Sequence, residues 1–402
     1  MFKGALPGFR DFYPQELAER AFIMKTWRTV ARRYAFVEYD GPPLEPLDLY
    51  TKKSGEEIVG QLYNFVDKGG RDVALRPEMT PTVARMVAAR ANTLRKPVRW
   101  FSVPQLFRYE RQQKGRLREH YQLNVDIFGS PDVAADAELV ACAVDMMRAF
   151  KLTSSDVVVR VSDRRLLQAY LASLAVPDDA LPGVFAVIDK LDRTPGEVSA
   201  EKLAALGLSA DAVTRIVDIA SATLADVQAR VVGTPAAAHA DEFQRYLAYS
   251  AALLGGDASW LRLDLSIVRG LAYYTGIVFE LFDRSGEFRA ICGGGRYDTL
   301  LQSLGGTDLP ALGFGMGDVV LGELLRSKGL MLPEQSVADL WLAADESLPL
   351  EQVMLEAARQ RAGGLSVEYS LRSQSMSKQK KAAQASGARD FVTLSNDDVQ
   401  NG

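Results

Sequence analysis

Residues 107–129 read Phe107-Arg-Tyr-Glu-Arg-Gln-Gln-Lys-Gly-Arg-Leu-Arg-Glu-His-Tyr-Gln-Leu-Asn-Val-Asp-Ile-Phe-Gly129. A mostly apolar run at residues 103–107 leads into this stretch, and an alternating pattern over residues 121–128 ends it. The pattern predicts two antiparallel strands joined by a basic loop around Gly115. Arginine side chains on such a loop are planar and permanently charged, which suits them to binding phosphate. A basic loop by itself is also typical of an ordinary solvated surface.

The alternation over residues 121–128 also sorts the side chains of the second strand. Gln122, Asn124 and Asp126 fall on the same face, because successive residues of a strand point to opposite sides. Three polar side chains on one face would be costly in a core unless they were paired. The pattern therefore predicts a polar pocket on this face.

A second signature lies far downstream and reads Val268-Arg-Gly-Leu-Ala-Tyr-Tyr-Thr-Gly276. It is followed by a run of glycines within Cys292-Gly-Gly-Gly-Arg-Tyr-Asp298. Glycine allows a backbone to approach a ligand closely, although a glycine-rich turn would explain the run as well.

The two signatures, in this order, resemble the class II histidyl-tRNA synthetase family, most closely the branch found in some bacteria and plant organelles. Residues 107–129 are similar to motif 2 of that family, and residues 269–274 to its Arg-Gly-Leu-x-Tyr-Tyr element. The resemblance begins at Leu6-Pro-Gly-Phe-Arg-Asp11, runs to about residue 330, and continues more faintly to the C-terminus. It implies ATP-dependent attachment of histidine to its tRNA through a histidyl-adenylate.

The resemblance also implies roles for residues at matching positions of this sequence. Arg108 and Arg269 are the implied catalytic residues, since they would stabilise charge at the α-phosphate of ATP. The implied ATP-binding residues are Arg108, Glu110, Arg116 and Arg269. The implied histidine-binding residues are Glu78, Thr80, Gln122, Asp126, Tyr273 and Tyr274. The implied contacts to the acceptor end of the tRNA are Arg111, Gln113 and Arg118.

The chain departs from the family pattern at three places. Motif 3 reads Gly313-Phe-Gly-Met-Gly-Asp-Val-Val-Leu321, with Val319 and Val320 where the family usually has Glu and an ATP-binding Arg. Losing a charged contact of this kind costs about 1.5–3 kcal/mol of binding free energy. Ala272 also replaces a common Asp, and Asp126 stands where many members have Glu.

These departures leave two other interpretations open. A catalytically inactive paralogue serves as the histidine-sensing regulatory subunit of ATP phosphoribosyltransferase, and such paralogues typically lose catalytic arginines. An RNA-binding or signalling module could also keep the fold, since a fold does not fix a function. The retention of Arg108, Arg116 and Arg269 favours the active enzyme.

The predicted fold class is α+β: a class II synthetase-like, mainly antiparallel sheet flanked by helices, with a helical insertion and a small C-terminal α/β domain. Residues 1–163 would form the first part of the catalytic core, with motifs 1 and 2. Residues 164–257, rich in Ala and Leu with Pro and Gly breaks, indicate the helical insertion. Residues 258–330 would complete the core. Strands alternate with helices over residues 336–402, which resemble a short anticodon-binding domain.

The prolines of Gly41-Pro-Pro-Leu-Glu-Pro46 predict that this segment leaves regular structure. In the family the segment is motif 1, which builds the dimer interface, so the resemblance implies a homodimer. A rigid surface loop would explain the prolines equally well.

Composition limits the other classes of function. The chain has 402 residues, 48% hydrophobic and 24% charged, which fits a globular protein of two or three domains. A net charge of −4 means that binding of nucleic acid must rely on a local basic surface. Two cysteines argue against a disulfide framework and favour the cytoplasm, and two histidines argue against a histidine-built metal site or a Ser-His-Asp triad. No apolar run approaches the roughly 20 residues of a membrane span.

The resemblance implies histidine, ATP and tRNA(His) as substrates, with Mg2+ accompanying the β- and γ-phosphates of ATP. The sequence names no protein ligand for that metal. Lys378, Lys380 and Lys381 near the C-terminus could contact phosphates of the anticodon stem or could form a solvated helix face.

Overall fold

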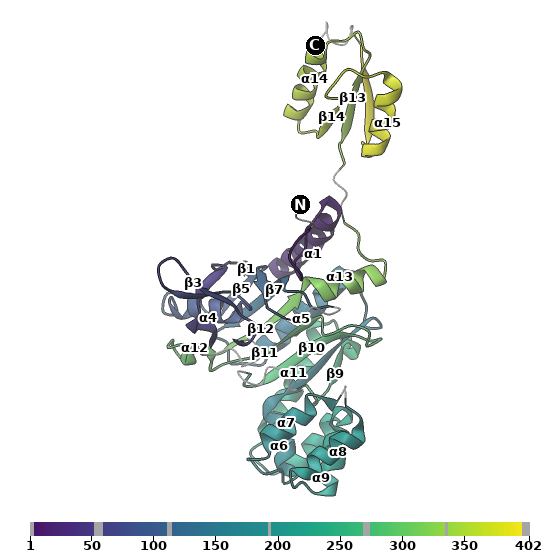
Figure 1. The fold of residues 1–402 in the computed structure, drawn as a ribbon. Helices are drawn as coiled ribbons and strands as arrows, with labels where there is room; N and C mark the ends of the chain where they lie inside the picture. Colours follow the sequence, from purple (N-terminus) through teal and green to yellow (C-terminus); the bar gives the residue numbers. More distant parts are fainter. Residues whose placement is uncertain are drawn as a thin grey trace. The chain divides into compact units, whose positions relative to one another are not determined.

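The computed structural model describes residues 4–51, 59–110, 115–191, 194–267, 274–333 and 337–395. The chain divides into two compact units, Met1–Leu332 and Pro333–Gly402. The predicted α+β fold class is confirmed. The first unit holds a large, mostly antiparallel sheet flanked by helices, and the second holds a small parallel sheet with helices (Figure 1).

The large sheet has the strand order β1-β5-β7-β12-β11-β10-β8-β9 over the described residues. In that order its strands are Val37–Glu38, Val98–Ser102, Glu119–Phe128, Ala311–Gly317, Cys292–Arg296, Ile277–Asp283, Val157–Asp163 and Leu261–Leu263. The outer pairs β1/β5 and β8/β9 are parallel, and the pairs between them are antiparallel. Strands from both halves of the sequence thus meet where β7 pairs with β12.

On the side away from β12, β7 pairs with two strands, whereas the sequence predicted one. Residues 105–107 do form a short strand, β6 (Gln105–Phe107), antiparallel to the start of β7. The longer partner is β5, which the sequence pattern did not predict. Pro104 lies between the two and cannot donate a ladder hydrogen bond, but its carbonyl accepts one from the Gln122 backbone N–H at 3.1 Å.

Helices α1 (Pro14–Arg33), α5 (Ala134–Ala149) and α13 (Asp318–Ser327) pack together beside the central strands (Figure 1). Helix α5 is buried on nearly all sides and rich in alanine, which lets its backbone come close to its neighbours. The buried Trp27 of α1 donates from its indole N–H to the Met316 sulfur of β12 at 3.2 Å. This contact ties the N-terminal helix to the strand that carries motif 3.

Helices alone connect β8 to β9 among the described residues of that stretch. They are α6 (Arg164–Ser173), α7 (Leu181–Ile188), α8 (Gly196–Ala205), α9 (Ala210–Val217), α10 (Leu224–Val231) and α11 (Ala237–Leu253), with short 3-10 turns at Ile219–Ser221 and Ala258–Trp260. Side chains of Asp163, Ser209 and Thr223 cap three of these helices at their N-termini. Helix α11 then packs against α5, so the segment shares the core of the large sheet.

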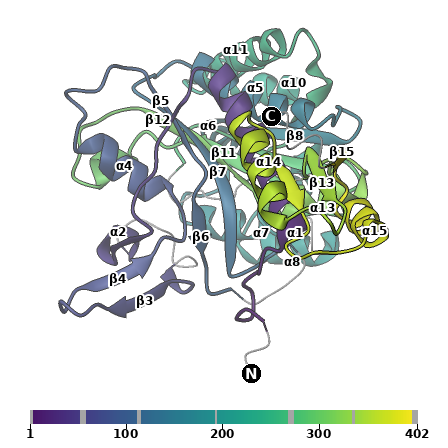
Figure 2. The same cartoon turned by 90° about the horizontal axis from the view of Figure 1, so that it is seen from above.

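A second small sheet, in the order β2-β4-β3, lies beside α2 (Asp48–Thr51) and α4 (Thr80–Ala88) (Figure 2). Its strands are Leu44–Pro46, Asp72–Leu75 and Tyr63–Val66. The prediction that residues 41–46 leave regular structure is therefore wrong for the last three. An edge strand tolerates proline because one side of its backbone needs no partner.

In the second unit, β13 (Leu340–Ala344) lies between β14 (Val367–Tyr369) and β15 (Asp390–Leu394), and both pairings are parallel. Helices α14 (Leu350–Ala362) and α15 (Met376–Ser386) connect them. The alternation of strands and helices predicted for this region is confirmed. The buried Gln379 joins α15 to the sheet, since its amide donates to the Ala344 carbonyl at 2.6 Å and accepts from the Ala344 N–H at 3.2 Å.

A buried ion pair joins β11 to α5 in the first unit. The Arg296 guanidinium contacts the Asp136 carboxylate, with Nε 3.2 Å from each oxygen, and the two residues are 5% and 3% exposed. Arg296 also donates to the carbonyl oxygens of Ser130 and Asp132 at 3.0 and 3.2 Å. One side chain thus fixes the end of a central strand to the helix that covers it.

Replacing Arg296 with methionine should lower the free energy of unfolding by about 3–5 kcal/mol, because the buried Asp136 carboxylate loses its partner. Urea denaturation followed by circular dichroism would measure the loss. The double variant Asp136→Leu/Arg296→Met removes both charges and should recover much of the stability. Equal destabilisation of the single and double variants would contradict this account.

Candidate active site

A pocket of about 320 Å³ opens over the middle of the large sheet, where β7, β11 and β12 lie side by side. The size suits a small molecule. Its walls come from the end of β6, the loop around Gly115, the β10–β11 hairpin and the start of α13. Segments more than 190 residues apart in the sequence therefore contribute to one cavity.

Glycines make the floor of this pocket. In the register of the sheet, Gly313 of β12 pairs with Asp126 of β7, and Gly315 pairs with Asn124. A Cβ on Gly313 would collide with the Asp126 carboxylate and would lie 2.7 Å from the Tyr297 hydroxyl. A Cβ on Gly315 would lie 2.8 Å from the side-chain amide of Gln122. The missing side chains on β12 make the room that the polar side chains of β7 occupy.

The polar face expected on β7 faces this pocket. Gln122, Asn124 and Asp126 all line it, and the last two are buried. Tyr297, which follows β11, donates its hydroxyl proton to Oδ1 of Asp126. The other oxygen, Oδ2, is buried and has no hydrogen-bond partner within the described ranges of the chain. Asp126 thus holds a buried acceptor atom that a hydrogen-bond donor could satisfy.

Burial dominates the electrostatics at this end of the pocket. Loss of hydration raises the pKa of Asp126 to about 7, and the hydrogen bond from Tyr297 acts against that rise. The ring of Tyr274 lies nearby, 6.5 Å from the ring of Tyr297, and Arg164 holds its carbonyl oxygen with a 2.7 Å hydrogen bond. The carboxyl is therefore poised to change its charge near neutral pH.

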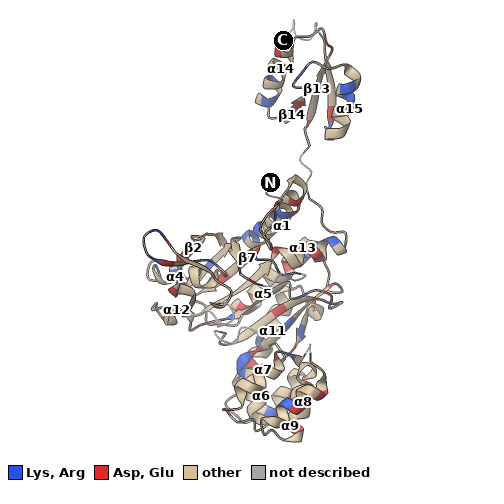
Figure 3. Ribbon diagram, viewed as in Figure 1, with Lys and Arg blue, Asp and Glu red and all other residues tan. Residues whose placement is uncertain are grey.

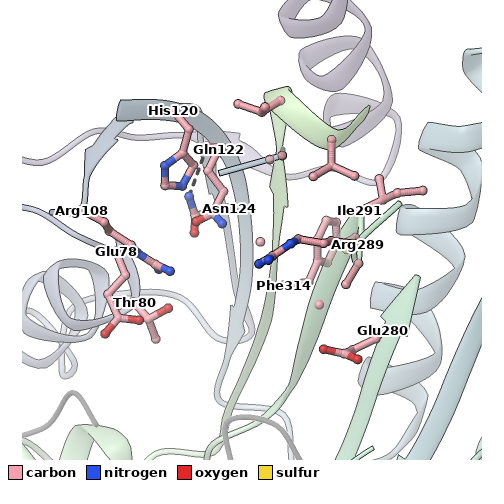
Figure 4. A pocket seen from close by; sticks show the side chains of 18 of the residues that line it. Glu78, Thr80, Arg108, His120, Gln122, Asn124, Glu280, Arg289, Ile291 and Phe314 are labelled. Carbon is pink, nitrogen blue, oxygen red and sulfur yellow. Dashed lines mark hydrogen bonds between the residues drawn. The ribbon is translucent and has the colours of Figure 1, made fainter. Parts of the chain in front are cut away.

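Arginines gather at the other end of the pocket. The half-buried Arg108 donates from Nε to the Pro77 carbonyl at 2.9 Å, which fixes its guanidinium next to Glu78 and Thr80 (Figure 4). Glu110 lies 3.0 Å from Arg116 and 4.0 Å from Arg108. One carboxylate thus orients two guanidinium groups that a phosphate could contact.

His120 also lines the pocket but stays uncharged. Burial, followed by the nearby charges of Arg108 and Arg10, lowers the pKa of His120 to about 3. At neutral pH the imidazole therefore adds no positive charge to the arginine end of the pocket and offers only a neutral donor or acceptor.

The N-terminal segment holds two walls of the pocket together. Arg10 pairs with Glu119 of β7 at 2.6 Å and with Asp318 of α13 at 2.9 Å. Asp318 in turn accepts the Tyr121 backbone N–H at 2.9 Å. Motif 2 and motif 3 are thereby fixed to each other by buried carboxylates.

Of the residues predicted for the site, the structure brings eight around this pocket: Glu78, Thr80, Arg108, Glu110, Arg116, Gln122, Asp126 and Tyr274. Arg118 does not line it. Its guanidinium lies 4.2 Å from the centre of the Tyr109 ring, and its stem packs on Gly8. Arg111, Gln113, Arg269 and Tyr273 lie outside the described residues.

Among the residues that line the pocket, four with polar or charged side chains were not predicted from the sequence: His120, Glu280, Arg289 and Tyr297. Glu280 could have been noticed as the one acid within an otherwise apolar stretch at residues 277–282. Tyr297 and Arg289 flank the glycine run on either side, but no spacing rule marks them as neighbours of motif 2.

No group of three or more His, Cys, Asp or Glu side chains in the described ranges is placed to hold a metal ion. None of the helices described combines the length and the apolar composition needed to cross a membrane.

Comparison with known proteins identifies the relatives of this chain. The family model described as histidyl-tRNA synthetase matches residues 8–317. The histidine–tRNA ligase of Opitutus terrae is 44% identical over 390 residues, covering 96% of this chain and 89% of the relative. The chloroplastic/mitochondrial histidine–tRNA ligase of Arabidopsis thaliana is 42% identical over 397 residues, with 98% and 81% coverage.

Solved structures share the fold at lower identity. A histidyl-tRNA synthetase from Nostoc superposes with a TM-score of 0.83 at 22% identity, covering 98% of this chain and 92% of that one. A Bacillus halodurans protein, titled an ATP phosphoribosyltransferase regulatory subunit/histidyl-tRNA synthetase, has a TM-score of 0.79 at 22% identity, with 98% of each chain covered. At such identity these two comparisons support the fold alone.

The antiparallel sheet, the motifs that it carries and these matches define a class II aminoacyl-tRNA synthetase, a class of enzyme that uses ATP to ligate an amino acid to tRNA. Within that class, the chain belongs to the histidyl-tRNA synthetase family. The family predicted from residues 107–129 and 268–276 is confirmed.

The glycine floor makes a specific prediction. Gly313→Ala should raise the KM for histidine at least tenfold, because the new methyl group would displace Asp126 and Tyr297 (~1.4 kcal/mol per factor of ten). Steady-state kinetics at saturating ATP would measure it. Gly322→Ala on α13 is the matched control, since its Cβ would meet only ordinary contacts, the nearest being 3.6 Å from Arg326. An unchanged KM in Gly313→Ala would show that the glycine is not needed for room.

Proposed function

We propose that this chain attaches histidine to tRNA(His) in two steps, with a histidyl-adenylate made first in the pocket over β7 and β12. Histidine–tRNA ligase is the activity of its near-full-length relatives at 38–44% identity. The observation that carries the mechanism is a single pocket that combines two buried carboxylates, Glu78 and Asp126, with the guanidinium groups of Arg108 and Arg116. Such a pocket suits a cationic amino group and an imidazole beside a triphosphate.

Histidine is proposed to bind beside the two buried carboxylates, Glu78 and Asp126. Glu78 is buried and would accept a charge-assisted hydrogen bond from the α-ammonium group, with Thr80 and Gln122 as further partners. Asp126 would accept an imidazole N–H at Oδ2, while Tyr297 holds Oδ1. Tyr274 would close this part of the pocket, and Tyr273 is proposed to do so with it. A buried acceptor without a partner favours a substrate that brings a donor, which gives selectivity for histidine.

The arginine end is proposed to bind ATP. A carboxylate oxygen of histidine attacks the α-phosphorus, the new oxygen–phosphorus bond forms, and the bond to pyrophosphate breaks with its electron pair leaving on the pyrophosphate oxygen. Arg108 would neutralise charge on the α-phosphate, Arg269 is proposed to do so with it, and Arg116 and Glu110 would contact the nucleotide. Fixed positive charge and in-line placement supply most of the rate in such transfers. Mg2+ is proposed to accompany the β- and γ-phosphates.

The tRNA contacts and the assembly are proposed from the family resemblance. Arg111, Gln113 and Arg118 would meet the acceptor end, for which arginine and glutamine are chemically suited. Lys378, Lys380 and Lys381 are exposed on α15, whose basic residues are visible in Figure 3, and would contact tRNA phosphates. A homodimer through the motif 1 region and a cytoplasmic location complete the proposal, the latter in keeping with two buried, unpaired cysteines.

The regulatory alternative rests on Val319 and Val320 in motif 3. Against it, identity to proteins named histidine–tRNA ligase reaches 44%. The structure whose title mentions a regulatory subunit is 22% identical. The retained arginines at the pocket also favour the ligase.

The deciding experiment is histidine-dependent exchange of pyrophosphate into ATP. We expect exchange with histidine and not with other amino acids, and its loss by at least a hundredfold in Arg269→Ala and Arg108→Ala. Circular dichroism of the variants would show whether the fold is kept. Normal exchange in Arg269→Ala would contradict its catalytic role, and histidine binding without any exchange would favour the regulatory alternative.

The raised pKa of Asp126 predicts how histidine binding depends on pH. A group with a pKa of about 7 is only about one tenth ionised at pH 6, and the ionised carboxylate accepts an imidazole N–H more strongly than the neutral carboxyl does. The KM for histidine should therefore fall up to about tenfold more between pH 6 and pH 8 in the native protein than in Asp126→Asn. The imidazole of the substrate titrates in the same way with either protein, so the difference between the two pH profiles gives the contribution of Asp126. Parallel pH profiles would rule that contribution out.

A further inference from the structure

Arg289 lines the pocket, although neither signature in the sequence includes it. It lies on the loop between β10 and β11, and this loop is folded around one buried carboxylate. Asp283, 3% exposed, accepts hydrogen bonds from the Ser285 hydroxyl and from the backbone N–H groups of Glu287 at 3.1 Å and Phe288 at 3.0 Å. Arg289 thus follows directly after a well-fixed turn.

The side chain of Arg289 extends from this loop into the cavity. In the view of Figure 4, its guanidinium points past Phe314 toward Asn124, and Arg108 approaches from the other side of Asn124. The pocket is therefore lined by guanidinium groups from two separate segments, the start of motif 2 and the β10–β11 loop.

Arg289 and Val320 both lie close to Gly115 on the pocket wall. Val320 is the residue that stands where the motif 3 arginine is expected, in the first turn of α13. Its Cγ2 lies 3.4 Å from the position that a Cβ on Gly115 would occupy, and Cδ of Arg289 lies 3.9 Å from the same point. The β10–β11 loop, the motif 2 loop and α13 therefore converge where the family pattern would put a cation.

Valine at position 320 and arginine at position 289 suit each other chemically. An arginine stem is apolar and packs well on a small apolar side chain, while its head reaches a polar cavity. An arginine at position 320 would have to share this space with Arg289, whereas valine leaves room for it. The pocket would then still contain a guanidinium group at this wall, supplied by the β10–β11 loop in place of α13.

We propose that Arg289 is an ATP-binding residue, and that it supplies from the β10–β11 loop the guanidinium that α13 lacks at Val320. The inference rests on the proposed function and names one further residue for it. Arg289 would contact the triphosphate or the base of ATP, for which its planar, permanent charge is suited. It would contribute to nucleotide binding and leave histidine binding unchanged.

The test measures ATP and histidine separately in the full chain. Arg289→Ala should raise the KM for ATP at least tenfold in pyrophosphate exchange, with the KM for histidine within about twofold of its original value. The KM for ATP of Arg289→Lys should lie between those of the native protein and Arg289→Ala, because lysine keeps the charge and loses the planar, two-pronged guanidinium. Glu287→Ala on the same loop is the control, and it should leave both constants unchanged.

The relocation variant Arg289→Ala/Val320→Arg is the sharpest comparison. It returns a guanidinium to the same wall from α13, and it should recover at least part of the affinity for ATP that Arg289→Ala loses. An unchanged KM for ATP in Arg289→Ala would overturn the inference. A loss of ATP and histidine binding together, with a lowered thermal midpoint and no recovery in the relocation variant, would also overturn it, since Arg289 would then only support the loop.

Direct titration of ATP by calorimetry separates this inference from the proposed function. If the native protein binds ATP but shows no histidine-dependent exchange, the proposed function fails. Even then, the proposed role of Arg289 in binding ATP holds if Arg289→Ala weakens ATP binding at least tenfold. It falls when the titrations of the native protein and the variant coincide.

Discussion

The pocket depends on glycines at the centre of the large sheet, where any side chain would collide with the neighbouring strand. β7 carries polar residues on one face, and the neighbouring β12 offers Gly313 and Gly315 opposite them. The next strand, β11, also contributes a glycine that no larger residue could replace, because a Cβ on Gly294 would collide with the backbone of β12. Close-packed strands without side chains leave a hollow that the protein itself cannot fill. The pocket is therefore a direct consequence of the register between β7 and β12.

Fixing that hollow requires its walls to be held by strong contacts. Arg10 joins β7 to α13 through two buried carboxylates, and Arg296 joins β11 to α5 through another. Burial raises the pKa of the Asp318 carboxyl, and the charge of Arg10 opposes this rise. Removing either arginine would leave a buried charge without its partner, which is far more costly than the loss of a surface ion pair.

The same burial shapes the two ends of the pocket in opposite ways. It raises the pKa of Asp126 to about 7 and lowers the pKa of His120 to about 3, so Asp126 is mostly neutral below pH 7 and His120 is neutral above pH 3. Positive charge is then left to arginine, which stays protonated at any accessible pH. A ligand that brings a hydrogen-bond donor to Asp126 and negative charge to the arginines would satisfy both ends at once.

The sequence by itself determined the elements and the family. Alternation placed Gln122, Asn124 and Asp126 on one face, composition indicated the helical insertion, and two long signatures identified the synthetase, because these features depend on residues close together in the chain. Only the tertiary structure decided which distant residues meet. The pairing of β7 with β5, the edge strand that contains Pro46, the hydrogen bond from Tyr297 to Asp126 and the closeness of Arg289 and Val320 to Gly115 all join segments whose distance in the sequence carries no periodic signal. Register and packing bring such residues together, and they depend on the whole sheet rather than on any local pattern.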